Sequence, residues 1–194
     1  IKEKVGRIMK NDVLVYVFDG YADWEPSHVC SELNRQDSPF QVKTISLDKQ
    51  PKTSMGGFRV MPDYDMTDYP KEFKLLIISG GDSWLAGENT DILPVVDYAA
   101  RQQIPIAAIC AATSFLAENA YLDHVKHTGN SLEFMKKQAP HYRGEDFYVE
   151  EQAVSDGGIV TANGTAALEF AREIFFLLHV KNPQEIKDWY HFNK

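Results

Sequence analysis

The chain has 194 residues, a formal net charge of −8 and a hydrophobic fraction of 44%. These values are typical of one soluble domain covering residues 1–194, and they leave enough apolar residues for a substantial core. The negative balance, without a basic stripe, argues against binding to nucleic acid or to an anionic membrane surface.

Two cysteines, Cys30 and Cys110, are too few for a disulfide framework, so a reducing compartment is expected. No apolar segment approaches the length of a membrane span. No signal-peptide pattern opens the chain, although its first residue is Ile1 rather than Met. The sequence therefore predicts a cytoplasmic protein that does not contact a membrane.

Strand and helix patterns alternate along the first half of the chain. Continuous apolar runs predict buried strands, and periodic apolar positions predict helices. The expected elements are strands at 12–18, 40–47 and 73–79, a helix that begins near 23–26 and a helix over about 91–103. The glycine turn within 53–63, flanked by short extended stretches, predicts a hairpin at an edge.

The second half continues this alternation. Its expected elements are a strand at 104–109 with a helix directly behind it, a short strand or loop at 125–130, a helix to about 138, strands at 147–154 and 159–161, a helix launched from 163–165, and a final short helix at 183–189. Alternating strands and helices predict an α/β fold with a mostly parallel sheet.

The strand at 104–109 leaves almost no residues for a loop before the next helix, so the chain must turn sharply at Cys110. Ala108 and Ala112 are small enough for such a corner, as are the glycines of the Gly-x-nucleophile-x-Gly elbow. A cysteine there lies at a helix N-terminus, where free N–H groups and the helix dipole favour the thiolate. The pattern indicates a nucleophile; the alternative is a small core residue.

Ligands of parallel α/β sheets bind outside the carboxyl ends of the strands. Glu25 follows the first strand and could share a proton with Cys110; the alternative is a first-turn glutamate that faces water. Gly80 and Gly81 close the strand at 73–79. One of their N–H groups, with that of Ala111, could bind a developing oxyanion, and the alternative is a simple turn.

Three further residues follow or lie near strand ends. His127 could act as a general acid or base, and Asn163 opens the segment Asn163-Gly164-Thr165. Trp84, close to the presumed oxyanion amide, either lines the pocket or packs beneath it. The sequence has no zinc-type cysteine or histidine pair and no glycine-rich phosphate loop, so a site without metal or cofactor is expected.

An ordered set of motifs runs through nearly the whole chain. Its members are Asp19-Gly20 with Asp23-Trp24-Glu25, Gly56-Gly57 to Pro62-Asp63, Ile78-Ser79-Gly80-Gly81, Ala107-Ala108-Ile109-Cys110-Ala111-Ala112, Lys126-His127-Thr128, and Val160-Thr161-Ala162-Asn163-Gly164-Thr165 with Glu169-Phe170-Ala171. Taken together, they resemble the ThiJ/PfpI family of the class I glutamine amidotransferase-like superfamily.

This resemblance implies a flavodoxin-like three-layer α/β sandwich, usually a homodimer. It implies a reactive elbow cysteine, Cys110, beside a protonated Glu25, with oxyanion amides at Gly81 and Ala111. Many relatives with a Cys-His-acid triad carry histidine directly after the cysteine, where this chain has Ala111. A triad here would require His127 to supply the imidazole from another strand.

Family activities are varied, so the resemblance leaves several functions open. The leading hypothesis is an enzyme, of hydrolase, amidase, glyoxalase or deglycase type, whose Cys110 attacks a small carbonyl or amide compound. The second is an oxidative-stress sensor or chaperone in which Cys110 is oxidised. The third is a binding module that uses the same cleft without catalysis.

Overall fold

The computed structural model describes residues 9–194. Its main sheet has seven strands in the order β5-β2-β1-β6-β7-β9-β8, and all neighbouring strands are parallel except β8 and β9. The strands are β1 (Asn11–Tyr16), β2 (Phe40–Ser46), β5 (Tyr64–Asp65), β6 (Phe73–Ile78), β7 (Ile106–Ile109), β8 (Ala153–Asp156) and β9 (Ile159–Ala162).

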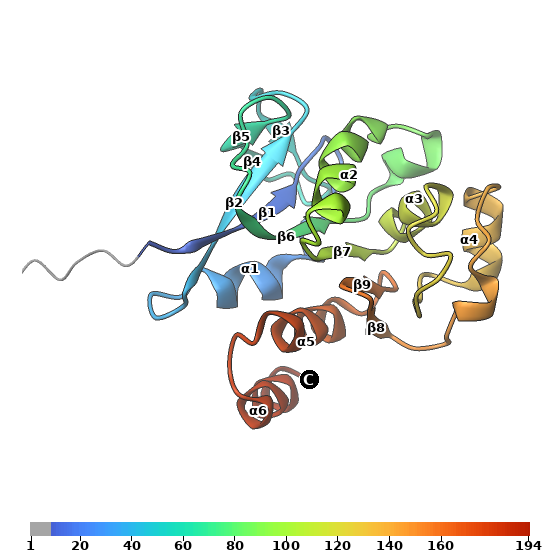
Figure 1. Cartoon of the computed structure of the whole chain (residues 1–194). Helices are drawn as coiled ribbons and strands as arrows, with labels where there is room; N and C mark the ends of the chain where they lie inside the picture. Colours follow the sequence, from blue (N-terminus) through green and yellow to red (C-terminus); the bar gives the residue numbers. More distant parts are fainter. Residues whose placement is uncertain (1–8) are drawn as a thin grey trace, which may run out of the picture.

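Helices cover both faces of this sheet, with α1 and α5 on one side and α2 and α3 on the other (Figure 1). The helices are α1 (Ser27–Leu33), α2 (Leu93–Arg101), α3 (Ala112–Glu118), α4 (Leu132–Gln138), α5 (Ala167–Leu178) and α6 (Pro183–Asn193). This is the expected flavodoxin-like three-layer sandwich with a mostly parallel sheet. No helix within residues 9–194 has the length and apolar character that a membrane crossing needs.

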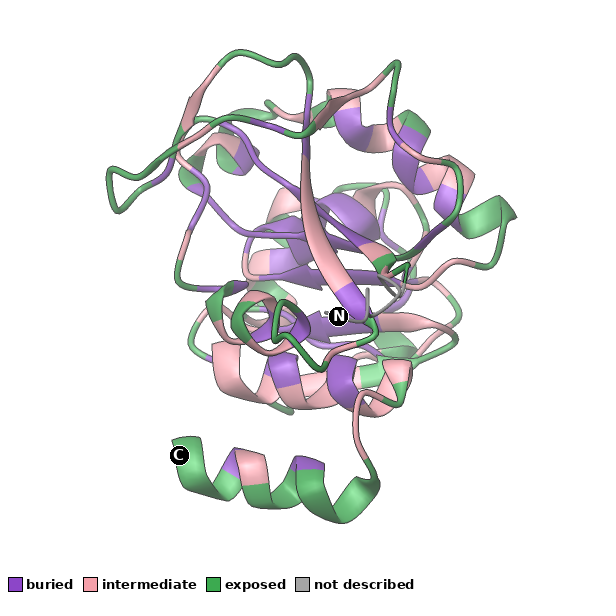
Figure 2. Cartoon of the chain, turned by 90° about the vertical axis from the view of Figure 1, so that its left-hand side faces the viewer, coloured by how far each residue is buried: buried purple, intermediate pink, exposed green. Residues whose placement is uncertain are grey.

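The central strands are buried because their residues are apolar on both faces. Every residue of β7 is buried, and so are the last four residues of β1 and of β6. Figure 2 shows the buried residues gathered in the sheet and on the inner helix faces, with α6 exposed along most of its length outside α5. The predicted strand runs therefore mark the core correctly.

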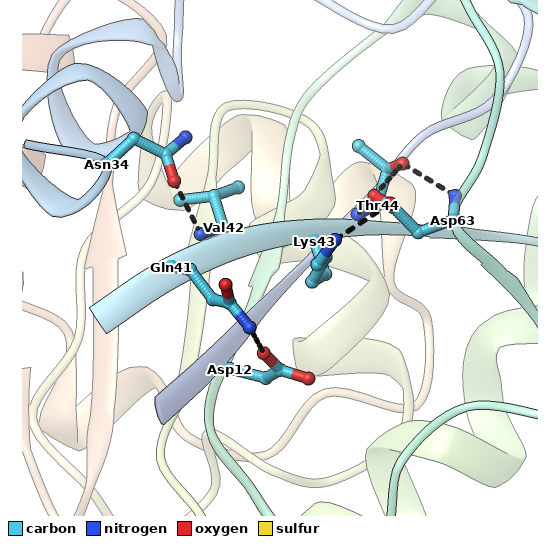
Figure 3. Close-up of polar contacts among 7 residues, drawn as sticks. All are labelled: Asp12, Asn34, Gln41, Val42, Lys43, Thr44 and Asp63. Carbon is cyan, nitrogen blue, oxygen red and sulfur yellow. Dashed lines mark hydrogen bonds and ion pairs between the residues drawn. The ribbon is translucent and has the colours of Figure 1, made fainter. Parts of the chain in front are cut away.

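The outer edge of β2 is covered by side chains along part of its length. β5 pairs with β2 only at Ile45 and Ser46, so within residues 9–194 the earlier N–H groups on this edge have no partner strand. Asn34 Oδ1 accepts the Val42 N–H at 2.9 Å, and Asp63 Oδ2 accepts the Thr44 N–H at 2.8 Å (Figure 3). These bonds protect an edge that could otherwise pair with another chain.

Two predictions on local structure need correction. The predicted strand at 147–154 is split: a 3-10 helix covers Glu145–Phe147, Tyr148 forms a single parallel bridge with His127, and β8 begins only at Ala153. The predicted hairpin exists as β3 (Lys52–Thr53) and β4 (Arg59–Val60), but it forms a separate antiparallel pair instead of extending the main sheet. In its place the short strand β5, which the sequence did not predict, occupies the edge beside β2.

The strand order reverses between β1 and β6, because β1 continues through α1 to β2 on one side while β6 lies on the other. In an open α/β sheet, such a switch point leaves a crevice at the carboxyl ends of the two strands. The segments after β1, β6, β7 and β9 all leave the sheet at this end. They carry the candidate residues.

Candidate active site

The turn at Cys110 is as sharp as the sequence predicts. β7 ends at Ile109, α3 begins at Ala112, and Cys110 has a φ of +60°. Such left-handed backbone in a non-glycine residue costs roughly 1 kcal/mol or more. The Cys110 N–H donates to Ala162 O at 3.0 Å, and the Thr113 hydroxyl donates to Cys110 O at 2.7 Å. These bonds hold the half-buried cysteine in its strained conformation.

Glu25 reaches the same point from the segment between β1 and α1. Its side chain is buried, with only 1% of the residue exposed, and its Oε2 accepts the N–H of Gly80 at 2.6 Å. The Ala22 N–H also donates to Gly80 O at 2.9 Å, which ties this segment to the end of β6. The alternative of a glutamate that faces water is therefore wrong.

Glu25 and Cys110 both pack closely against Gly80. A Cβ at Gly80 would lie 2.6 Å from Cys110 Cβ and 3.0 Å from both carboxylate oxygens of Glu25. Gly164, after β9, is just as close on another side, since its Cβ would lie 2.8 Å from Cys110 Sγ. The two glycines let the thiol and the carboxyl meet in a closely packed site.

The two acids oppose each other's ionisation. Burial raises the pKa of Glu25 to about 7, against the opposing effect of the hydrogen bonds with Gly80 and Cys110. Burial and the charge of Glu25 also raise the pKa of the Cys110 thiol. The lowered thiol pKa that a helix N-terminus would give is therefore outweighed, and ionisation of either group disfavours ionisation of the other.

Asn130 contacts the sulfur and was not among the sequence candidates. Its Nδ2 donates to Cys110 Sγ at 3.5 Å, and its Oδ1 accepts the Gly164 N–H at 2.9 Å. This contact and the N–H of Ala111 both lower the pKa of the thiol, in opposition to burial. The only sequence signal was its place in the short segment after His127, at the same edge of the sheet.

Asn130→Ala is expected to slow alkylation of Cys110 by iodoacetamide at neutral pH. Loss of the Nδ2 donor raises the pKa of the thiol, so that less thiolate is present. The rate should be measured against pH by intact mass, with the exposed Asn193→Ala as the control. A profile identical to that of the unmodified protein would show that this contact does not act on the sulfur.

The structure does not bring the imidazole of His127 to Cys110. The residue is 0% exposed, and its Nδ1 and Nε2 bond to Val125 O at 2.7 Å and to the Tyr142 hydroxyl at 2.5 Å. Burial also lowers the pKa of the ring. Both nitrogens are occupied, so in this conformation His127 fixes the loop that carries Asn130 and has no nitrogen free for proton transfer at the sulfur.

Of the two glycines that close β6, only Gly81 has an N–H free to bind an oxyanion. The Gly80 N–H is taken by Glu25, whereas the Gly81 N–H has no acceptor among residues 9–194.

Asn163 accepts the Thr165 N–H at 3.0 Å and shapes the turn before α5, so it positions Gly164 and does not contact the sulfur. Trp84 donates from its indole N–H to Ser79 O at 2.9 Å and both lines a pocket and packs on the core.

The other cysteine is set apart from this site. Cys30 lies on α1, and burial raises the pKa of its thiol to about 12. The two cysteines are both free. Among the residues from 9 onward, no group of three His, Cys, Asp or Glu side chains is placed to hold a metal ion.

The sequence pattern of the DJ-1/PfpI family matches residues 11–176. The chain belongs to the DJ-1/PfpI family. The match includes every residue of the site described above and ends before α6.

Two proteins of Bacillus subtilis (strain 168) are similar over nearly the full length. The uncharacterized protease YdeA is 40% identical over 181 residues, which cover 93% of this chain and 90% of YdeA. The uncharacterized protease YoaZ is 39% identical over 189 residues, which cover 94% of this chain and 90% of YoaZ.

Solved structures show the same DJ-1/PfpI architecture. A thiJ/pfpI family protein from Bacillus anthracis has a TM-score of 0.86 at 37% identity, with 96% of this chain and 92% of that chain covered. The DJ-1 superfamily protein Atu0886 from Agrobacterium tumefaciens has a TM-score of 0.85 at 33% identity, with coverages of 95% and 100%. The family resemblance expected from the motifs is confirmed.

Proposed function

We propose that the chain is a cysteine-dependent enzyme in which Cys110 Sγ attacks the carbonyl carbon of a small carbonyl or amide compound. The observation that carries this proposal is the buried Glu25 carboxyl, which packs against Gly80 together with Cys110 at the elbow. The proposal includes no metal or cofactor, and it keeps the expectation of a cytoplasmic homodimer. The protease names of YdeA and YoaZ support a hydrolase over the other enzyme types.

In the first step, Glu25 takes the thiol proton and later returns it to the oxygen of the substrate. When the proton moves to Glu25, the thiolate of Cys110 attacks the carbonyl carbon, forms the S–C bond and sends the π electrons to the oxygen. The N–H groups of Gly81 and Ala111 are the proposed donors to this oxygen. With an aldehyde, the Glu25 carboxyl then returns the proton to the oxygen, which gives a neutral hemithioacetal.

An amide would continue to hydrolysis. The tetrahedral intermediate collapses, the C–N bond breaks, and Glu25 gives its proton to the leaving nitrogen, which leaves a thioester on Cys110. Water then adds to the thioester with Glu25 as the base, and the acid product leaves as the thiol is restored. Glu25 carries out the proton transfers that an imidazole performs in a Cys-His-acid triad, because His127 has no free nitrogen.

Cys110→Ala is expected to abolish turnover in a panel of small aldehydes, amides and short peptides, because no other thiol is placed at the site. Product formation should be followed by mass spectrometry, which detects acids, amines and isomerised aldehydes alike. Cys30→Ala is the matched control and should leave every rate unchanged.

Turnover that survives Cys110→Ala would rule out the covalent mechanism. If no member of the panel is consumed by the unmodified protein, intact mass after mild peroxide decides the alternative. Selective addition of two oxygens at Cys110 would favour an oxidative-stress sensor, because Asn130 Nδ2 and the Ala111 N–H can donate to sulfinate oxygens as they do to the sulfur.

A further inference from the structure

A pocket lies beside α3, and its lining includes Ala111, one of the two proposed oxyanion residues. Two segments form most of its lining: α3 itself, and the loop that begins with the 3-10 helix η1 (Asp82–Ala86) and leads into α2; Gln138 of α4 adds one more residue. α3 follows Ala111 and η1 follows Gly81, so each of the two segments begins at one of the two oxyanion residues. A substituent on a carbonyl held by their N–H groups would extend between the two segments.

The pocket is mostly apolar. Trp84 and Phe115 both line it, with ring centroids 4.9 Å apart, and Leu85 and Leu93 add to the apolar lining. Its volume is about 230 Å³. An apolar cavity of about 150 Å³ holds a benzene molecule, so this pocket has room for an aromatic ring with a short linker.

The polar groups of the pocket favour an uncharged occupant that offers a hydrogen-bond acceptor. Glu88 and Glu118 are its charged residues, and none of the described residues that line it is basic. Their negative charge disfavours a carboxylate or phosphate. Ser114, one turn along α3 from Ala111, is only 6% exposed, and its hydroxyl has no hydrogen-bond partner. A buried hydroxyl of this kind gains stability from a ligand acceptor.

We propose that this α3 pocket binds an uncharged aromatic or bulky apolar substituent of the substrate, so that the enzyme prefers aryl-alkyl carbonyl or amide compounds to small or anionic ones. The proposal rests on the proposed function for its link to catalysis. Trp84, Phe115 and Leu93 supply the apolar contact, and Ser114 is the specificity residue that donates a hydrogen bond.

Binding can be measured apart from turnover in the Cys110→Ala protein. The probe is 3-phenylpropanamide, titrated by ligand-observed NMR beside propanamide and the anion succinamate. We expect 3-phenylpropanamide to bind roughly tenfold more tightly than either comparison compound, because only it fills the apolar pocket. In the unmodified protein, kcat/KM for hydrolysis of 3-phenylpropanamide should exceed that for propanamide by a similar factor of about ten.

Three further substitutions in the same protein test the assignment. Thr90→Trp, on the exposed rim, should fill the pocket and abolish probe binding without changing the core. Ser114→Ala should weaken the probe about fivefold, the value of one hydrogen bond. Ser46→Ala is the matched control, because Ser46 is another buried serine without a partner and does not line the pocket; probe affinity should stay unchanged.

Equal affinities for 3-phenylpropanamide and propanamide, or unchanged affinity in Thr90→Trp, would overturn the pocket proposal. Turnover of small aldehydes or amides that still depends on Cys110 would leave the proposed function standing in that case. Conversely, turnover that persists in Cys110→Ala overturns the proposed function, whereas tight probe binding would still establish the pocket. The two failures are therefore distinguishable.

Discussion

Glu25→Gln is expected to raise the free energy of unfolding at pH 8 by about 3 kcal/mol, while it lowers turnover. In the unfolded chain the carboxyl ionises at its ordinary value of 4.5, but burial holds it neutral in the folded protein up to a pKa of about 7. As the pH rises, the unfolded state loses its proton first, so the unmodified protein loses stability between these two values. Glutamine has no such proton to lose.

The gain should depend on pH in a way that a packing effect would not. Urea unfolding at pH 4 and pH 8 separates an ionisation effect from a packing effect. At pH 4 the Glu25 carboxyl is mostly neutral in both the folded and the unfolded chain, so the stability gain of Glu25→Gln should nearly vanish there. Glu72→Gln, at an exposed position, is the matched control and should show little change at either pH. An equal gain at both pH values would mean that the ionisation of Glu25 does not limit stability.

The higher stability should accompany a lower activity, since the glutamine cannot take up the thiol proton. Its oxygen can still accept the Gly80 N–H, so the site should keep its shape. Turnover should fall by roughly a hundredfold or more, the usual value of a general acid–base group. A buried acid that costs stability at neutral pH is what an enzyme retains for chemistry.

The elbow could be predicted from the sequence because its signals are local. Apolar residues run unbroken to Ile109, and a helix follows with small residues at 108, 111 and 112. A general rule placed Glu25 and Cys110 at one edge of the sheet, where the carboxyl ends of parallel strands lie, but it left a water-facing glutamate open. The pairing of the two residues was implied by the family resemblance.

The parts that could not be predicted depend on contacts between distant segments. Asn130 reaches the sulfur only because Gly164 binds its other end, a pairing across 34 residues with no sequence signal. His127 is occupied by Tyr142, whose position follows from the loop between α4 and β8. The pKa of the Cys110 thiol is raised because the elbow is buried. This effect of burial is larger than the lowering expected from the N-terminus of the seven-residue α3.

Gly80→Ala is expected to destabilise the protein by about 3 kcal/mol and to abolish turnover. Its new Cβ would lie 2.6 Å from Cys110 Cβ, and both atoms belong to short side chains that cannot move without moving the backbone. Glu25 offers no relief, because its carboxylate oxygens would lie 3.0 Å from the new Cβ and its Oε2 is held by the Gly80 N–H. The strained, tightly bonded elbow leaves little freedom to adjust.

A second substitution tests whether this contact is the cause. Cys110→Gly removes the opposing Cβ and suits the φ of +60°, so the double variant Gly80→Ala/Cys110→Gly should recover most of the stability lost in Gly80→Ala. Urea unfolding of the unmodified protein, both single variants and the double variant gives the coupling between the two positions. If the changes in unfolding free energy of the two single variants add up in the double variant, the contact is not the cause. Strong coupling between them would mean that the elbow is stable because Gly80 has no side chain.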